Sequence, residues 1–436
     1  MQELRVGILG FGVVGRGVVD LLLTQGELLR QRTGMAIRLR RIATRTPGRD
    51  RGLSLGDIEL TDDLQRVVAA DDIDVVVELM GGLQPARSAI EEALQSGKDV
   101  VTANKALLAT YGHELVPLAL AQHRELLFEA AVAGAIPIIK VLRESLAANR
   151  IDQLYGILNG TCNYILTEMR EQGSSFADVL RDAQAKGFAE ADPSFDIDGI
   201  DAAHKLAILA AISFGTFPAL SQIHIEGIRH VADIDIQWAT EMGYRIKLLG
   251  IAKQDAGGVE LRIQPTLVPV GSMVASVEGV HNAVFVRGHA AGTTMYYGRG
   301  AGEAPTASAV VGDLVEIARS RRAGCSGRVA PFSVMPEYIK RFPVRETDEW
   351  RGEYYLRLAV ADRPGVLAEV TQVLAKQQIS IDAIHQKGRS AVLAVPLIMV
   401  THATTERQIR LALAEMEQLD AVQETPRFIR IEPNVA

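Results

Sequence analysis

Hydrophobic positions in the first 140 residues fall into short, nearly continuous runs separated by longer amphipathic stretches. Runs of valine, isoleucine and leucine are typical of strands buried on both faces of a parallel sheet, and apolar residues that recur three or four positions apart indicate helices. Strands that alternate with helices predict βαβ units and a parallel sheet. The predicted strands are 4–9, 37–44, 74–79, 99–102 and 126–128, and the predicted helices are 13–30, 85–96 and 105–121.

The pattern changes after residue 137. Strands and helices are mixed without regular alternation, which favours an α+β domain over residues 138–319. Residues 320–352 show no clear period and are rich in arginine, glycine and proline, so we expect a linker there. In the α+β region the predicted strands are 151–158, 259–270 and 283–287, and the predicted helices are 177–186, 202–212 and 305–319.

A self-contained pattern fills residues 353–436. Its elements follow the order βαββαβ, which is the ferredoxin-like order. We therefore expect a third, C-terminal domain of the ferredoxin-like class. The predicted strands are 354–361, 379–386, 393–400 and 422–431, and the predicted helices are 366–375 and 405–419.

Composition excludes several classes of protein. The 436 residues are 48% hydrophobic and 23% charged, and the net charge of −7 argues against a general binder of nucleic acid or of anionic membranes. The longest apolar runs are shorter than the roughly 20 residues that span a bilayer. The two cysteines, Cys162 and Cys325, cannot build a disulfide framework or a four-cysteine zinc site. We expect a cytoplasmic protein that acts on a small molecule.

A glycine-rich loop follows the first predicted strand and opens the first predicted helix, as a dinucleotide-binding fingerprint requires. Gly10 allows the tight turn, Gly12 lets the backbone approach a pyrophosphate, and Gly15 lets the helix pack closely on the sheet. The helix N-terminus adds free N–H groups and partial positive charge. This predicts a Rossmann-type domain over residues 1–137, and the alternative is a glycine-rich turn without a ligand. The candidate cofactor-binding residues are Gly10, Phe11, Gly12, Val13, Val14, Gly15, Arg16 and Gly17.

The end of the second predicted strand indicates which dinucleotide binds. An acidic residue there would hydrogen-bond the ribose 2′-hydroxyl of NAD. This strand instead leads to Arg45, and no acid appears until Asp50. A guanidinium suits a 2′-phosphate by its charge and its forked donors. The sequence therefore favours NADP, NAD remains possible, and the alternative is that Arg45 is a solvated loop residue.

Lys105 follows a short predicted strand in the sequence Thr-Ala-Asn-Lys. The carboxyl ends of parallel strands face the ligand crevice, so we expect Lys105 near the nicotinamide end of the cofactor. The alternative is a surface lysine that begins a helix.

An unusual density of carboxylates precedes the predicted helix at 202–212. Asp201 and Lys205 are four residues apart on that helix and can pair. A lysine held in this way can donate a proton or polarise a carbonyl oxygen, and Glu190 could bind a substrate ammonium. The alternative is a solvated acidic loop, with Asp201 as a plain helix-start residue. The five carboxylates are Glu190, Asp192, Asp196, Asp198 and Asp201.

Two other functions stay open on the residues alone. Cys162 could be the nucleophile of an NADP-dependent semialdehyde dehydrogenase, although a small buried cysteine is the commoner case. A non-catalytic sensor of NADP and an amino acid would keep the glycine loop and the C-terminal domain, but it would not need the Asp201–Lys205 pair.

Together, these motifs resemble homoserine dehydrogenase over nearly the whole chain. The resemblance rests on VGILGFGVVGRGVV at 6–19, TANK at 102–105, NGTCNYIL at 159–166 and above all GFAEADPSFDIDGIDAAHK at 187–205. The segment DRPGVLAEV at 362–370 resembles the ACT domain, a module that binds small regulatory ligands. The resemblance is to the monofunctional form of the family, which lacks an aspartate kinase region.

The resemblance implies NAD(P)H-dependent reduction of L-aspartate 4-semialdehyde to L-homoserine, a step toward threonine, methionine and isoleucine. It makes Lys205 the proton donor, and it makes Asp201 and Glu190 substrate-binding residues. Gly187 would lie nearby in the pocket, and Lys105 would contact the cofactor and the reacting oxygen. The domain at 138–319 would be the catalytic and dimerisation domain. One departure is Phe188, where some members carry tyrosine.

The resemblance also implies contacts that composition does not reveal. Gly302 would make a second cofactor contact, and its turn would bring the 305–319 helix back to the nucleotide domain. The ACT domain implies an amino-acid effector, with threonine favoured, and a homodimer or homotetramer. A sodium ion is implied on the carboxylate of Glu129 and on the main-chain carbonyls of Val132, Gly134 and Ile136.

Overall fold

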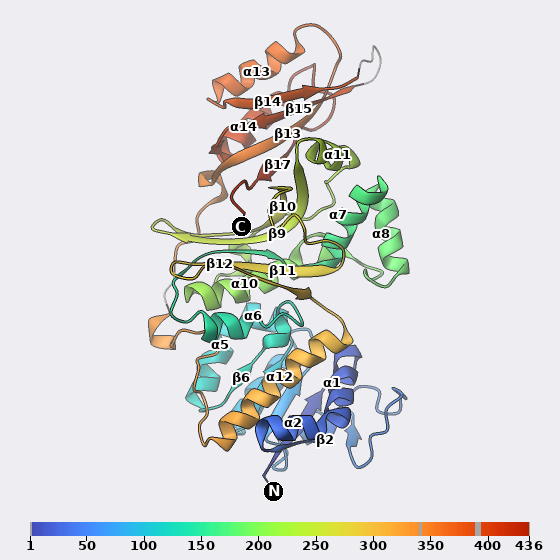
Figure 1. The fold of residues 1–436 in the computed structure, drawn as a ribbon, viewed down its shortest axis with the longest axis vertical. Coiled ribbons are helices and arrows are strands. Elements are labelled where there is room, and N and C mark those ends of the chain that lie inside the picture. The colour runs from blue at the N-terminus through green and yellow to red at the C-terminus, as the bar shows by residue number, and fades with distance from the viewer. Residues whose placement is uncertain (1, 340–341, 389–393, 436) are drawn as a thin grey trace.

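Three α/β units are stacked along the long axis of the molecule, with the N-terminal unit at the bottom of Figure 1 and the C-terminal unit at the top. This computed structural model describes residues 2–339, 342–388 and 394–435. The predicted fold class is confirmed: a parallel-sheet domain, an α+β domain and a C-terminal βαββαβ unit follow one another. The domain boundaries stay predictions. In the described part of the chain, no helix is long and apolar enough to cross a membrane.

The N-terminal domain is a parallel sheet of order β3-β2-β1-β4-β5-β6. Its strands are β1 Glu3–Leu9, β2 Ala36–Ala43, β3 Glu59–Thr61, β4 Val75–Glu78, β5 Asp99–Thr102 and β6 Leu126–Leu127. Its helices are α1 Val13–Thr24, α2 Gly26–Thr33, α3 Gln65–Val68, α4 Ala86–Gln95 and α5 Lys105–Ala121. The single helix predicted over 13–30 is wrong, because Gln25 leaves helical geometry and Gly26, a poor helix former, follows it.

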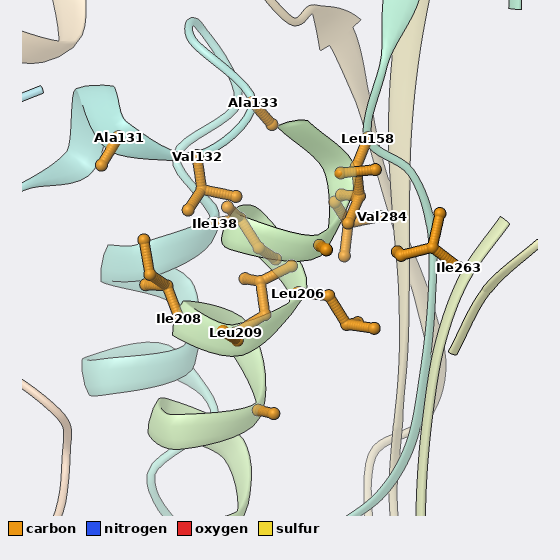
Figure 2. Close-up of a cluster of buried hydrophobic side chains, with 14 of the residues drawn as sticks. Ala131, Val132, Ala133, Ile138, Leu158, Leu206, Ile208, Leu209, Ile263 and Val284 are labelled. Atoms are coloured by element: carbon orange, nitrogen blue, oxygen red, sulfur yellow. The ribbon is translucent and has the colours of Figure 1, made fainter. Parts of the chain in front are cut away.

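The middle domain is built on a mainly antiparallel sheet, and helix α10, Ile200–Phe214, lies between this sheet and the N-terminal domain (Figure 1). Its strands are β7 Ile151–Ile157, β8 His224–Ile225, β9 Tyr244–Asp255, β10 Gly258–Pro269, β11 His281–Gly288 and β12 Gly292–Arg299. Its helices are α6 Ile138–Lys140, α7 Gly160–Gln172, α8 Phe176–Ala185, α9 Ser194–Ile197, α10 Ile200–Phe214 and α11 Asp233–Glu241. Helix α10 is buried along most of its length. Figure 2 shows its side chains packed among Val132, Ile138, Leu158, Ile263 and Val284.

Helix α12, Glu303–Arg322, returns from the middle domain to the N-terminal one and lies beside α1 (Figure 1). The close approach needs Gly17, because an added Cβ would lie 2.9 Å from Glu303 Cγ and 3.0 Å from Ala307 Cβ. At the far end of α12, Arg321 pairs with Asp74 and Asp99 of the parallel sheet, at 3.1 and 2.8 Å. The N-terminal domain is therefore completed by a helix that follows the middle domain in sequence.

The C-terminal unit does not stand apart from the middle domain. Strand β17 pairs in parallel with β10, where Thr266 faces Arg430 and Leu267 faces Ile431, so the two sheets join as β12-β11-β7-β9-β10-β17-β13-β15-β14. Its elements are β13 Arg351–Val360, α13 Val366–Lys376, β14 Ile381–Gln386, β15 Val395–Thr401, α14 Glu406–Met416 and β17 Arg427–Ile431. Residue 393 of the strand predicted over 393–400 lies outside the described residues.

Candidate active site

A carboxylate buried between two lysines lies where the first and second domains meet. Asp201 Oδ1 is 2.5 Å from Lys105 Nζ, and Lys205 Nζ donates to Asp201 Oδ2 at 2.7 Å. Lys105 begins α5 at the carboxyl end of β5, while Asp201 and Lys205 occupy the first two turns of α10. The three side chains come from segments about 100 residues apart, and the fold brings them into contact.

Local backbone features set the directions of these side chains. Gly199, the N-cap of α10, has φ +84°, a left-handed conformation that favours glycine. Asn104 caps α5, because its side chain accepts from Leu107 N at 3.1 Å. Each cap fixes the helix start that carries a site residue, Asp201 in one case and Lys105 in the other.

Burial and neighbouring charges shift the pKa values of this cluster in opposite directions. Only 2% of Asp201 and 8% of Lys205 is exposed. Burial alone would raise the pKa of Asp201, but the ammonium groups of Lys205 and Lys105 hold it below its usual value. Burial lowers the pKa of Lys205, and Asp201 opposes that shift. Lys205 Nζ also donates to Leu158 O at 2.7 Å, so two of its three N–H groups are used.

Two further residues belong to this network. Asn159 Nδ2 lies 2.8 Å from Asp196 Oδ1 and 2.9 Å from Asp201 Oδ2, and it donates to both. Burial raises the pKa of Asp196, although the hydrogen bond from Asn159 opposes the shift. Sequence reasoning assigned neither residue a role. Asn159 could have been found as a helix-capping residue, because asparagine is favoured immediately before a helix. In the structure it caps α7, and its side chain accepts from Cys162 N at 2.8 Å.

The remaining carboxylates of the acidic segment face outward. Asp198 pairs with Arg229, and Asp192 accepts from Ser194 N at 3.1 Å. Glu190 is exposed, as is Gly187, which has a left-handed φ of +74°. The Phe188 ring packs 4.9 Å from that of Tyr164. The structure thus divides the five carboxylates into an inner pair, Asp196 and Asp201, and three on the rim.

The glycine loop has the geometry of a dinucleotide cradle. An added Cβ at Gly15 would lie 2.4 Å from Gly10 O, so the helix start packs directly on the turn. An added Cβ at Gly12 meets nothing within 4 Å, which leaves its backbone open to a ligand. The loop follows β1 at the same edge of the sheet as Lys105. The loop therefore fits the pyrophosphate of a dinucleotide, and the free N–H groups at the N-terminus of α1 can donate to it.

Arginine side chains bind the segments that surround the glycine loop. Arg16 pairs with Glu303, which follows Gly302 at the start of α12. Arg51 was not predicted from the sequence, yet it donates to Phe11 O at 2.7 Å and to Thr46 Oγ1 at 2.9 Å. Arg45 is exposed and forms no hydrogen bond or ion pair with another described residue, so its guanidinium is available to a ligand.

The segment implied to hold sodium surrounds a buried carboxyl group. Glu129 Oε1 and Oε2 accept from Ile139 N and Lys140 N, each at 2.8 Å, and Glu129 N donates to Asp313 Oδ2 at 2.9 Å. Burial raises the pKa of Glu129 to about 7 and raises that of Asp313 as well. The following turn is left-handed at Ala133 and Gly134, with φ +56° and +48°. Neither carboxyl group forms an ion pair with another described residue, although the charge of Arg143 acts on both. Buried oxygen ligands of this kind fit a hard cation.

Cys162 does not have the surroundings of a nucleophile. The side chain is fully buried at the start of α7, and burial raises the pKa of the thiol well above its ordinary value. Its Sγ donates to Asp196 O at 3.2 Å. A catalytic thiol needs a lowered pKa and access to substrate, so the geometry disfavours the semialdehyde dehydrogenase alternative.

Comparisons with known proteins agree along the chain. Family models match residues 10–129 (homoserine dehydrogenase, NAD binding domain), 137–315 (homoserine dehydrogenase) and 354–421 (ACT domain). Homoserine dehydrogenases of Neisseria gonorrhoeae and Pseudomonas aeruginosa are each 45% identical to this chain, and 99% of each sequence is covered. The crystal structure of a homoserine dehydrogenase from Thiobacillus denitrificans is 48% identical, with a TM-score of 0.94 over 99% of both chains. A hyperthermophilic archaeal homoserine dehydrogenase in complex with NADPH is 29% identical, with a TM-score of 0.63 over 72% of this chain and 97% of that one.

Proposed function

This chain belongs to the homoserine dehydrogenase family, and we propose that it reduces L-aspartate 4-semialdehyde to L-homoserine with NADPH as the preferred cofactor. It is an oxidoreductase that acts on a CH–OH group and takes a nicotinamide dinucleotide. The observation that carries the proposed chemistry is the buried Asp201 carboxylate between the Lys105 and Lys205 ammonium groups.

The two lysines can stabilise the charge on the carbonyl oxygen of the substrate and protonate it. When bound, the cofactor supplies the hydride that the aldehyde carbon accepts. Negative charge then develops on the oxygen, and a fixed ammonium in a nearly dry site stabilises it strongly. Lys205 has one N–H left after those given to Leu158 O and Asp201, so it can hold that oxygen and deliver the proton. Asp201 positions both lysines, and Lys105 reaches the site from the cofactor side.

Substrate recognition is assigned to the rim of the site. Glu190 presents its carboxylate to solvent, and we assign it the substrate ammonium, which a carboxylate can bind. Gly187 has a left-handed φ, and an added Cβ there would meet nothing within 4 Å. Its backbone is therefore open to a ligand, and we assign it to the substrate pocket. Phe188 supplies no hydroxyl, so recognition in this chain does not use one at that position.

The preference for NADPH rests on Arg45. Its free guanidinium stands after β2, where the ribose of a bound dinucleotide is expected. The archaeal relative whose structure is in complex with NADPH supports the same choice. Arg45→Ala should raise the KM for NADPH about tenfold or more and leave the KM for NADH nearly unchanged. An equal change in both would assign Arg45 no part in cofactor selection.

Sodium and regulation complete the proposal. A sodium ion held by Glu129 and the carbonyls of Val132, Gly134 and Ile136 would offset the charge of the buried carboxylates. Replacing sodium by potassium should then lower the melting temperature of the wild type but not that of Glu129→Gln.

We assign the enzyme to threonine, methionine and isoleucine synthesis, with feedback by threonine through the ACT domain and a homodimer or homotetramer as the working form.

Product analysis tests the reaction. Purified enzyme, L-aspartate 4-semialdehyde and NADPH should give L-homoserine and NADP in equal amounts, identified by chromatography. Addition of threonine should slow the reaction. Cofactor oxidation that yields a carboxylic acid or no homoserine would contradict the proposal, because the reaction would then belong to another class.

A further inference from the structure

A cavity at the seam between the middle and C-terminal domains has no part in the reaction described above. Its volume is about 300 Å³, at the lower end of the range for small-molecule sites. Helix α14 and strand β17 form one side, and the segment between β8 and α11, together with Pro265 of β10, forms the other. The cavity therefore exists only while the two domains are in contact.

The lining combines an apolar wall with charges of both signs. Glu226 faces the cavity from the middle domain, and Arg410 and Arg427 face it from the C-terminal unit. The Glu226 side chain is 38% exposed and lies 4.0 Å from His224 Nε2. Burial lowers the pKa of His224 to about 4, so this imidazole is neutral at neutral pH and does not balance the carboxylate. Neither arginine pairs with it among the described residues. The apolar wall consists of Val231, Leu413, Phe428 and Ile429.

The same arginines retain free donors. Arg410 gives Nε and Nη2 to Glu406 Oε1, at 3.0 and 2.5 Å, which leaves Nη1 unused. Arg427 is exposed, and no hydrogen bond or ion pair to another described side chain holds it. Burial raises the pKa of Glu226, while the positive charges of Arg430, Arg410 and Arg427 oppose the shift from across the seam. Two further carboxylates line the cavity, but Asp235 already accepts from Tyr355 and Arg357, and Glu417 accepts from Thr425 Oγ1. Glu226 and the two guanidinium groups form no ion pair with one another among the described residues.

We propose that this cavity binds a zwitterionic α-amino acid with a small side chain, its ammonium on Glu226 and its carboxylate on Arg427 and Arg410. Arginine binds carboxylates through parallel N–H donors, and the apolar wall takes the side chain. The proposal rests on the proposed function, because the bound amino acid would act as an effector of that reaction.

The seam cavity is connected to the acidic segment 190–201 through Glu226, Gly227 and Ile228. Glu226 is followed by Gly227 and Ile228, and Ile228 N donates to Ile197 O at 2.9 Å. An added Cβ at Gly227 would lie 2.1 Å from Ile197 O, so the two segments are in backbone contact. Ile197 stands between Asp196 and Asp201. A ligand that draws Glu226 toward the arginines would shift this contact and, with it, the inner carboxylates.

Calorimetry on the full chain tests the site without any reaction. L-Threonine, L-isoleucine and L-methionine are the probes, with D-threonine as the stereochemical control. At least one L-amino acid should bind, and both Glu226→Gln and Arg427→Gln should weaken it about tenfold or more. Ala414→Trp, which fills the cavity without removing a charge, should also weaken binding.

Arg363→Gln is the matched control, because Arg363 is an exposed arginine of the same domain that pairs with Glu369 away from the seam. It should bind the amino acid as the wild type does. Loss of binding in Arg363→Gln with normal binding in the three seam variants would overturn the proposal, and so would the absence of binding by any probe.

Initial rates separate this proposal from the proposed function. Glu226→Gln should keep the uninhibited kcat of the wild type and lose inhibition by the bound amino acid. A chain that binds the amino acid at the seam but does not reduce aspartate semialdehyde would contradict the proposed function alone. Inhibition that persists unchanged in Glu226→Gln and Arg427→Gln would contradict the seam site alone.

Discussion

Lys205 holds a positive charge in a place nearly closed to water. Burial lowers the pKa of this amine, and Asp201 keeps the shift from being larger. A general acid works best when its pKa lies near the working pH, because it is then protonated and still a good donor. Burying Lys205 costs the fold stability, and the same burial suits this amine to the proton-donor role proposed above.

The lowered pKa of Lys205 should appear in the pH dependence of kcat. Only the protonated amine donates, so kcat should fall as pH rises through this pKa, at a pH below the 10.5 of an ordinary lysine. Lys205→Arg stays protonated over this range, and its residual kcat should show no such fall. A fall at the same pH in wild type and Lys205→Arg would assign it to another group.

Asp201→Asn should damage both stability and rate. The change leaves two ammonium groups, one of them buried, without their carboxylate. Breaking a buried pair in this way costs roughly 3 kcal/mol or more of the free energy of unfolding. Urea denaturation measures this loss, and kcat should fall as well because Lys205 loses its position. Asp192→Asn, in the same loop but exposed, should change both little. Equal effects of the two changes would contradict the role of Asp201.

The sequence predicted part of this cluster for a physical reason. Asp201 and Lys205 are four positions apart on one helix, so their pairing is a local property, and the structure contains it. The contact between Lys105 and Asp201 and the bridge from Asn159 to Asp196 join distant segments. No spacing along the chain encodes such contacts, and only the resemblance brought Lys105 and Asp201 into one site.

At the scale of elements, α12 shows how a late helix completes an early domain. Its Arg321 reaches Asp74, which also accepts from Arg5 Nε and Nη2, each at 2.9 Å. Burial would raise the pKa of Asp74, but these guanidinium groups lower it to about 2. The helix is anchored to the parallel sheet through this carboxylate.

Asp74→Asn should therefore weaken the attachment of α12 to the parallel sheet, and the resulting loss of stability should depend on pH. The pKa of Asp74 is about 2 in the folded state and 3.8 in the unfolded chain. Its contribution is present above pH 3.8 and is lost as pH falls toward 2. At neutral pH we expect a loss of about 1–2 kcal/mol in the free energy of unfolding, allowing for partial exposure. Asp72→Asn, at an exposed neighbour, is the control. A loss that persists at pH 2 would contradict the ionic account.

Helix and strand prediction failed where polar groups are buried in regular structure. Strand β9 was not predicted, and one reason is Lys247, which breaks its apolar pattern although the residue is fully buried. Its Nζ donates to Val277 O at 2.6 Å and to Glu278 Oε2 at 3.1 Å. A pattern of hydrophobicity cannot anticipate a buried lysine whose partners lie in another segment.

At the scale of the molecule, the catalytic and ACT domains share one sheet. Only two residue pairs join β10 to β17, so the sequence could predict each domain but not their union. Ionic contacts reinforce it: Arg357 Nε donates to Asp235 at 2.7 Å, and Glu432 accepts from Arg262 and Lys253, each at 2.7 Å. The two domains are thereby joined by both main-chain and ionic contacts.

Deleting residues 352–436 should therefore destabilise the remaining chain. The deletion exposes the edge of β10 and leaves Arg262 and Asp235, both buried, without these partners. We expect a melting temperature several degrees lower and a tendency to aggregate. An unchanged melting temperature in the truncated chain would show that the shared sheet contributes little.

The reaction of Lys205→Ala tests the central claim most directly. NADPH oxidation with L-aspartate 4-semialdehyde would be followed by absorbance in wild type and variant, and NADPH binding would be followed by fluorescence. The account predicts that kcat falls by about 10² or more, the usual contribution of a positioned proton donor, while NADPH binds nearly as before. A variant that binds NADPH and keeps a near-normal kcat would contradict the account, because the proton would then come from another group.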